Sequence, residues 1–234
     1  FTNAQTVYTV TKTTDPDPFE HSFKNDDNLC DPEIYGTLRW AINKVNSNTG
    51  ESIIAFDITG TGVQEIILNS FLPQLTNDVT IDGTTQNGYS QGNPLIKLNG
   101  TNIKQSCFQN YNCELNIKGI WFYNFANNVC WLYETENSQI EDNIISGNHE
   151  AFASNYAFGV AVCNNVSFYN NVIEEETDND TARLYQYGFY IKISDNLIIG
   201  GTEAGQANII KNCNTALWVA QSNSVKISGN LIYN

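Results

Sequence analysis

Apolar and polar residues alternate over short segments of this chain, and in its second half these segments recur around an asparagine. Alternating residues stand before an Asn and an aliphatic pair after it in SQIEDNIISGN (138–148), VSFYNNVIEEE (166–176), VKISGNLIYN (225–234) and the looser IKISDNLIIGG (191–201). A period of two predicts strands, and Asn tolerates the tight turn that ends them. Short strands that repeat with one turn are typical of a parallel β-solenoid, in which each coil stacks on the previous one.

The spacing of the repeated turn residue gives the number of residues in each coil. We take Asn143, Asn171, Asn196 and Asn230 as equivalent turn residues, separated by 28, 25 and 34 positions. A bare coil needs about 20 to 25 residues, so the excess must form loops. The segments 146–158, 174–187 and 200–208 account for it. The first two follow the same turn in successive coils, and we therefore expect them side by side on one flank.

One helix is predicted near the start of the chain, in GTLRWAINKVNSNTG (36–50). Its apolar residues Leu38, Ala41, Ile42 and Val45 fall at helical spacing, with Thr37 as the expected N-cap and Gly50 closing the segment. Such a helix can cover the open first coil. We expect one domain, residues 1–234, in which residues 1–50 form a strand, an acidic Pro-rich loop and this capping helix, and residues 51–234 form the coils.

The charge balance limits the partners. The chain has 25 Asp and Glu against 11 Lys and Arg, a formal net charge of −14. A basic face is what nucleic-acid binders carry, so we expect neither nucleic acid nor an anionic membrane as a partner. No apolar run approaches the roughly 20 residues that span a bilayer, so membrane insertion is not expected. Asn makes up roughly one residue in seven, and stacked coils can join identical Asn side chains in ladders.

Six cysteines leave two readings open. No C-x-x-C occurs and the histidines are His21 and His149, so the spacing matches no zinc pattern. In a secreted chain an even count permits disulfides, and Cys107 with Cys113 is the expected pair. Alternatively, several cysteines are small buried hydrophobes inside the solenoid.

Three stretches resemble the secreted bacterial right-handed parallel β-helix repeat proteins, which are related in fold to pectate lyases. They are GTLRWAINKVN (36–46), LPQLTNDVTIDGTTQNGY (72–89) and IIGGTEAGQANII (198–210). The resemblance implies an all-β right-handed parallel β-helix with one N-terminal capping α-helix, secreted or at the cell surface. It also implies a longer whole protein. One departure is that the capping motif lacks the Cys that commonly starts it. A secretory signal ending near Ala4 is a further expectation.

The flank with the two long loops is the expected ligand site, because it combines aromatic rings with carboxylates. Rings offer faces to sugar CH groups, and carboxylates accept from hydroxyls. The plainer alternative is that the rings pack the loops onto the coils and the acids are merely solvated. The residues that we expect to bind ligand are Tyr156, Phe158, Arg183, Tyr185 and Tyr187.

Acidic residues in the second loop predict a Ca²⁺ site, because this ion takes six to eight oxygen ligands. The segment is not an EF-hand, since the Gly and the closing Glu of that loop are missing. The expected ligands are Glu174, Glu175, Glu176, Asp178 and Asp180.

The function that these features favour is a non-catalytic extracellular or cell-surface module. It binds an extracellular polysaccharide or a cell-surface glycan, or mediates adhesion to a surface, and Ca²⁺ is its expected ion. The alternative is a polysaccharide lyase or glycoside hydrolase. A lyase would use Ca²⁺ with Arg183 or Lys192, and a hydrolase would use two carboxylates, for which Glu141, Asp142 and Asp82 are candidates. A third possibility is a structural stalk that binds nothing.

Overall fold

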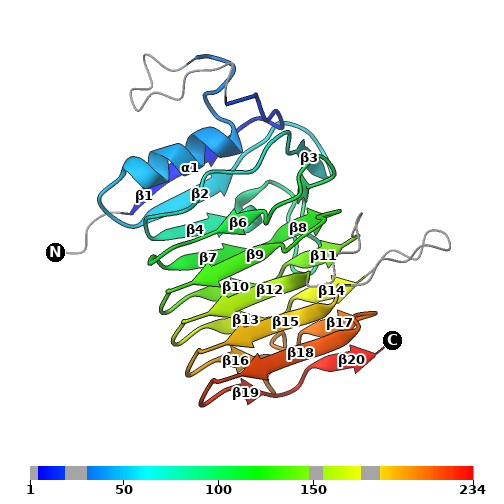
Figure 1. The fold of residues 1–234 in the computed structure, drawn as a ribbon. Helices are drawn as coiled ribbons and strands as arrows, with labels where there is room; N and C mark the ends of the chain where they lie inside the picture. Colours follow the sequence, from blue (N-terminus) through cyan, green and yellow to red (C-terminus); the bar gives the residue numbers. More distant parts are fainter. Residues whose placement is uncertain (1–4, 19–30, 148–154, 175–184, 234) are drawn as a thin grey trace.

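The computed structural model describes residues 5–18, 31–147, 155–174 and 185–233, which form a parallel β-helix (Figure 1). Each full coil contributes one strand to each of three sheets, and all strand pairs within the sheets are parallel. The prediction of a β-solenoid is therefore confirmed. No helix in the described residues is long and apolar enough to cross a membrane.

Three sheets form the walls of the coils. The first contains β1 (Thr6–Val10), β2 (Ser52–Phe56), β4 (Val79–Asp82), β7 (Leu115–Lys118), β10 (Gln139–Glu141), β13 (Ser167–Tyr169), β16 (Ile198–Ile199) and β19 (Lys226–Ile227). The second contains β3 (Gln64–Ile67), β5 (Ile96–Asn99), β8 (Ile120–Tyr123), β11 (Ile144–Ser146), β14 (Val172–Glu174), β17 (Ile209–Lys211) and β20 (Leu231–Tyr233). The third contains β6 (Phe108–Gln109), β9 (Cys130–Tyr133), β12 (Tyr156–Ala161), β15 (Tyr187–Lys192) and β18 (Thr215–Ala220).

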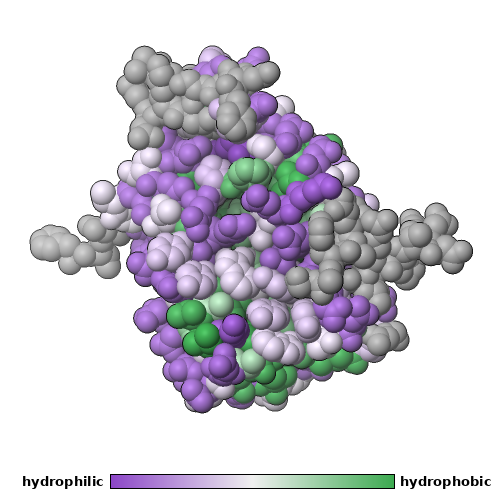
Figure 2. All heavy atoms as spheres, viewed as in Figure 1, coloured by the Kyte–Doolittle hydropathy of each residue, from purple (hydrophilic) through white to green (hydrophobic). Residues whose placement is uncertain are grey.

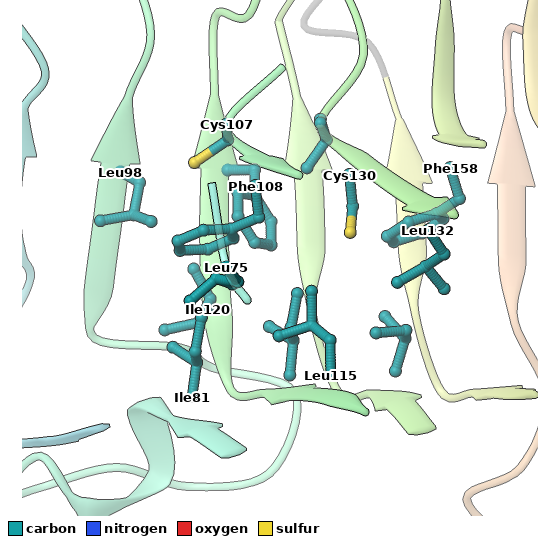
Figure 3. Close-up of a cluster of buried hydrophobic side chains, with 14 of the residues drawn as sticks. Leu75, Ile81, Leu98, Cys107, Phe108, Leu115, Ile120, Cys130, Leu132 and Phe158 are labelled. Carbon is teal, nitrogen blue, oxygen red and sulfur yellow. The ribbon is translucent and has the colours of Figure 1, made fainter. Parts of the chain in front are cut away.

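The core lies inside the coils, where inward residues of successive strands stack in register. Phe158 of the third sheet stands opposite Phe189 of the next coil. Both rings contact Phe168 of the first sheet, with centroids 5.1 to 5.4 Å apart. All three are essentially inaccessible to solvent. Figure 3 shows the same arrangement nearer the N-terminus, where Leu, Ile, Phe and Cys side chains from several coils meet. Alternating residues therefore build one continuous core.

A buried asparagine ladder fixes the turn between the first and second sheets. Asn143, Asn171, Asn208 and Asn230 each donate through Nδ2 to a carbonyl of the preceding coil. Neighbouring ladder side chains are joined by Nδ2 to Oδ1 hydrogen bonds of 2.9 to 3.0 Å. The ladder therefore satisfies backbone and side-chain groups that the sharp turn would otherwise leave unpaired inside the protein.

The prediction that Asn196 is a turn residue equivalent to Asn143, Asn171 and Asn230 is wrong. Asn196 lies between the third and first sheets, is exposed, and donates to Asn164 at 2.9 Å. Asn208 takes its place, because the segment 200–207 lies in the turn between β16 and β17. The true spacings along the ladder are 28, 37 and 22 residues.

Helix α1 (Leu38–Ser47) contacts β1 and β2 at the N-terminal end of the coils, as predicted for a cap (Figure 1). The Thr37 side chain accepts from the backbone N–H of Trp40 at 3.2 Å, so the expected N-cap is confirmed. The side chains of Arg39 and Asp15 are both 2% exposed and form two hydrogen bonds of 2.8 Å. Arg39 also donates to the carbonyls of Ser70 and Phe71, which connects the helix to the coils.

The apolar core reaches the surface at the last coil. Ile227 and Ile232 are 47% and 50% exposed. They stand in register with Ile199 and Ile210 of the coil before, which are buried. Exposure of these two side chains thus arises because no further strand within the described residues stacks on them.

The expected disulfide between Cys107 and Cys113 is not formed. Both are free and buried, as are Cys130 and Cys163. Cys213 is buried as well, and Cys30 lies outside the described residues. The reading of these five as small buried hydrophobes is confirmed, and Figure 3 shows Cys107 and Cys130 among the core side chains.

Slow labelling of the buried thiols should follow from this placement. Burial raises the pKa of the Cys107, Cys113 and Cys130 thiols. It also raises the pKa of the Cys163 thiol, to about 11. A raised pKa lowers the thiolate fraction, and the thiolate is the reactive form. We expect these four sites to react slowly with a thiol reagent near pH 8 in the folded protein, and quickly after denaturation without reductant. Peptide mapping by mass spectrometry resolves each site, and a linked Cys107–Cys113 peptide would contradict the structure.

Candidate functional site

A series of aromatic side chains covers the outer face of the third sheet, and we call it the aromatic stripe. The face lies toward the viewer in Figure 1, and Figure 2 shows side chains of intermediate hydropathy gathered over it. All its members except the more exposed Tyr111 are half-buried. The stripe consists of Tyr111, Trp131, Tyr133, Tyr156, Tyr187, Tyr190 and Trp218.

Strand register produces the stacking. Tyr190 of β15 stands directly opposite Trp218 of β18, and parallel strands lie about 4.8 Å apart. That separation suits offset stacked rings. The Tyr190 and Trp218 centroids are 4.5 Å apart with 9° between the ring planes. Tyr156 of β12 continues the stack on the side of Tyr190 away from Trp218, with centroids 5.1 Å apart and 15° between the ring planes.

A glycine makes room for Tyr156. Gly159 occupies the outward position that pairs with Trp131 on one side and Tyr190 on the other. A Cβ at Gly159 would lie 2.2 Å from Cε2 of Tyr156 and 2.3 Å from Cε3 of Trp131. The Tyr156 ring therefore fills the space above Gly159 and connects Trp131, at 5.5 Å, with Tyr190.

Replacing Gly159 with alanine should break the stripe at this point. The added methyl group must displace the ring of Tyr156 or of Trp131, at an overpacking cost of about 1–3 kcal/mol. We expect a lower unfolding free energy and an altered near-ultraviolet circular dichroism of the aromatic residues. Gly50→Ala is the control, because a Cβ there meets nothing within 4 Å and its φ lies outside the left-handed region. Unchanged aromatic dichroism in Gly159→Ala would contradict the proposed packing.

The other end of the stripe turns toward the edge of the sheet. Trp131 and Tyr133 of β9 lie 6.5 Å apart with nearly parallel planes, and Tyr111 stacks on Tyr133 at 5.8 Å. The hydroxyl groups of Tyr133 and Tyr156 remain protonated donors over the physiological range. A hydrogen bond to Glu134 raises the pKa of Tyr133, and the negative charge of Glu134 raises it further. Burial raises the pKa of Tyr156 to about 12.

An acidic groove of about 640 Å³ runs past the ends of β9, β12 and β15, next to Tyr133. None of the described residues that line it is Lys, Arg or His. Its walls also contain Asn112, Asn137 and Asn164. The carboxylates that line the groove belong to Asp78, Glu114, Glu134, Glu136 and Asp195.

The structure divides the ligand-binding residues predicted from the sequence. Tyr156 and Tyr187 are half-buried and belong to the aromatic stripe. Phe158 and Tyr185 are each 1% exposed and lie in the core, so the expectation that they face a ligand is corrected. Arg183 lies outside the described residues, as do His149, Glu150 and Phe152.

The calcium site stays a prediction. The carboxylate of Glu174 accepts from Nζ of Lys211 at 2.7 Å, and this hydrogen bond raises the pKa of Lys211. Glu175, Glu176, Asp178 and Asp180 lie outside the described residues. Among the residues that are described, no three His, Cys, Asp or Glu side chains gather where they could hold a metal ion.

The acids proposed for a hydrolase have structural partners. Asp82 accepts from the backbone N–H of Thr84 at 3.1 Å and pairs with Lys118, so it belongs to a turn. Asp142 is 8% exposed, and its Oδ1 accepts from the Gly92 N–H and from Asn170. Burial raises the pKa of Asp142 against these hydrogen bonds. Glu141 accepts from Gln139 on the outside of the first sheet.

Sequence reasoning missed five stripe residues: Tyr111, Trp131, Tyr133, Tyr190 and Trp218. A signal for three of them is present, because CWL (130–132), FYI (189–191) and LWV (217–219) each set one ring between two apolar residues of a strand. Aligning the coils by these triplets would have placed the rings in one column. No protein-family model matches this chain, and no curated protein matches its sequence.

Proposed function

We propose that this protein is an extracellular or cell-surface module that binds carbohydrate through the aromatic stripe. The observation that supports the proposal is the continuous series of half-exposed rings on the outer face of one sheet. Folded monomers rarely expose long apolar surfaces without an interaction that uses them. The rings of the core already provide the internal packing, so the outer stripe is available for a ligand.

Ring chemistry favours a sugar as the ligand. The apolar parts of Tyr and Trp rings pack against sugar CH groups, while the Tyr hydroxyl and the Trp N–H form hydrogen bonds. Neighbouring rings hold one another in place, with spacings of 4.5 to 5.5 Å from Trp131 to Trp218. Little side-chain entropy is then lost on binding, because the surface is already ordered.

Binding without turnover distinguishes this proposal from the lyase and hydrolase alternative. The purified protein is applied to a glycan array and then incubated with the glycans that it binds. Unsaturated products and new reducing ends are measured after incubation. We expect binding and no products. Products would favour the enzyme, and an array without any binding would favour the structural stalk.

A variant of the aromatic stripe tests whether the glycan binds at this surface. We expect Tyr190→Ala to weaken binding of any glycan found on the array by about three- to tenfold, because one ring contact contributes about 0.5–1.5 kcal/mol. Tyr169→Ala is the control, since Tyr169 is a half-buried tyrosine at the end of β13 in the first sheet. Equal losses in the two variants would contradict a site on the third sheet.

A further inference from the structure

We infer that the ligand of the aromatic stripe is a neutral glycan chain that lies along the axis of the coils and not a polyuronate. This inference rests on the proposed carbohydrate-binding function. It follows from the direction in which the rings are arranged, from the small residues beside them, and from the charges around them.

The direction comes from the strands that carry the rings. Trp131, Tyr156, Tyr190 and Trp218 belong to β9, β12, β15 and β18, one ring for each successive coil. Parallel strands are about 4.8 Å apart, so this series extends for about 15 Å along the axis. A chain that runs across the coils would meet at most two of these rings. A chain parallel to the axis can contact all of them.

Two small residues interrupt the column of outward positions next to the rings. Ala161 stands between Tyr133 and Lys192 in the register of the third sheet, and Ala220 follows Lys192. Ala161 is 7% exposed and offers no side chain that would block an extended ligand. An extended ligand can therefore approach the rings at Ala161 and Ala220, and Tyr133 and Lys192 border these positions.

Charge decides between a neutral and an acidic chain. Lys192 is the one charged residue in the strands that the structure describes in the third sheet. The adjoining groove contributes carboxylates, among them Glu134 and Glu136, without a described cation. A polyuronate carries a negative charge on every sugar. The five carboxylates of this margin outweigh the single cation Lys192, so their net effect on a polyuronate is repulsion. A neutral chain has no such penalty.

Binding of matched hexasaccharides tests the inference. The probes are the neutral hexasaccharides of β-linked glucose, mannose, xylose and galactose, and the hexasaccharide of galacturonic acid, each measured by calorimetry. We expect at least one neutral probe to bind about tenfold or more tightly than the galacturonate probe. If the galacturonate probe binds as tightly as every neutral one and Tyr190→Ala weakens it, the inference is overturned and the proposed function stands. If no probe binds, the proposed function fails with it.

Two tryptophan variants test the direction of the chain. Trp131 and Trp218 lie at opposite ends of the ring series, so a chain along the axis contacts both. We expect Trp131→Ala and Trp218→Ala each to weaken the bound neutral hexasaccharide by about three- to tenfold. The phenylalanine variants at both positions keep a ring and are measured in case the alanine variants unfold. Full affinity in either alanine variant would overturn the axial arrangement. Where an alanine variant does not fold, full affinity in the phenylalanine variant at that position would overturn it, because phenylalanine lacks the second ring and the N–H of tryptophan.

A charge variant tests the discrimination without touching the stripe. Glu136 is exposed in the turn after β9. We expect Glu136→Lys to strengthen binding of the galacturonate probe about threefold or more at low salt, because attraction replaces repulsion, and to leave the neutral probe unchanged. An unchanged affinity for galacturonate would overturn the role of charge.

Discussion

Replacing Asp15 with alanine is expected to lower the free energy of unfolding by about 3–5 kcal/mol. The carboxylate forms two hydrogen bonds with Arg39 and accepts from the backbone N–H of Asn69 at 2.9 Å. Without it, a guanidinium that is 2% exposed keeps its charge inside the protein, and its remaining partners among the described residues are the carbonyls of Ser70 and Phe71. Urea unfolding followed by far-ultraviolet circular dichroism gives the free energy.

An exposed ion pair provides the control for this variant. Glu65 is 39% exposed and pairs with Lys97 at 3.3 Å. Surface pairs contribute about 0–1 kcal/mol, so Glu65→Ala should change the unfolding free energy little. The connection between helix α1 and the coils through Arg39 would be disproved if Asp15→Ala cost no more than Glu65→Ala.

The second large effect is expected at the asparagine ladder. Asn208 accepts from the N–H and the Nδ2 of Asn171, and donates to Asn230 and to the carbonyl of Phe168. Asn208→Ala strips partners from several buried groups, each of which costs about 1–3 kcal/mol when left unpaired. We expect a loss of about 3 kcal/mol or more of unfolding free energy, measured by urea unfolding.

The matched control is Asn196→Gly, because glycine suits the φ of +55° at Asn196. Its exposed side chain has a hydrogen bond to Asn164, and removing it should cost less than about 1 kcal/mol. The comparison separates the two assignments of the ladder. A larger loss in Asn196→Gly than in Asn208→Ala would restore the assignment that the sequence favoured.

The sequence predicted the fold class because strand and helix patterns are local. Alternating residues such as Val166, Phe168 and Ile173 are buried as expected, and Thr37 caps the one described helix. The ladder assignment is not local. Asn196 and Asn208 are both followed by aliphatic residues, and only pairing with the neighbouring coils shows that Asn208 stacks on Asn171.

The candidate site was harder to predict for two physical reasons. Strict alternation would place Phe158 on the same outer face as Tyr156. In β12 the alternation shifts, because Ala157 and Phe158 are both buried, so Phe158 lies in the core. The stripe also depends on register between coils, which brings Tyr190 onto Trp218 from 28 residues away. Gly159, which makes room for Tyr156, reads in the sequence only as a break in a strand.

The series from Trp131 through Tyr156 and Tyr190 to Trp218 has one ring per coil, so its length changes with the number of coils. A duplicated coil would bring its own ladder asparagine, its own core residues and one more outer ring, because each coil contacts only its neighbours. Binding surface would then grow in steps of one strand spacing, without redesign of the remaining coils. Duplication of the gene segment that encodes one coil would therefore lengthen this binding surface by one ring.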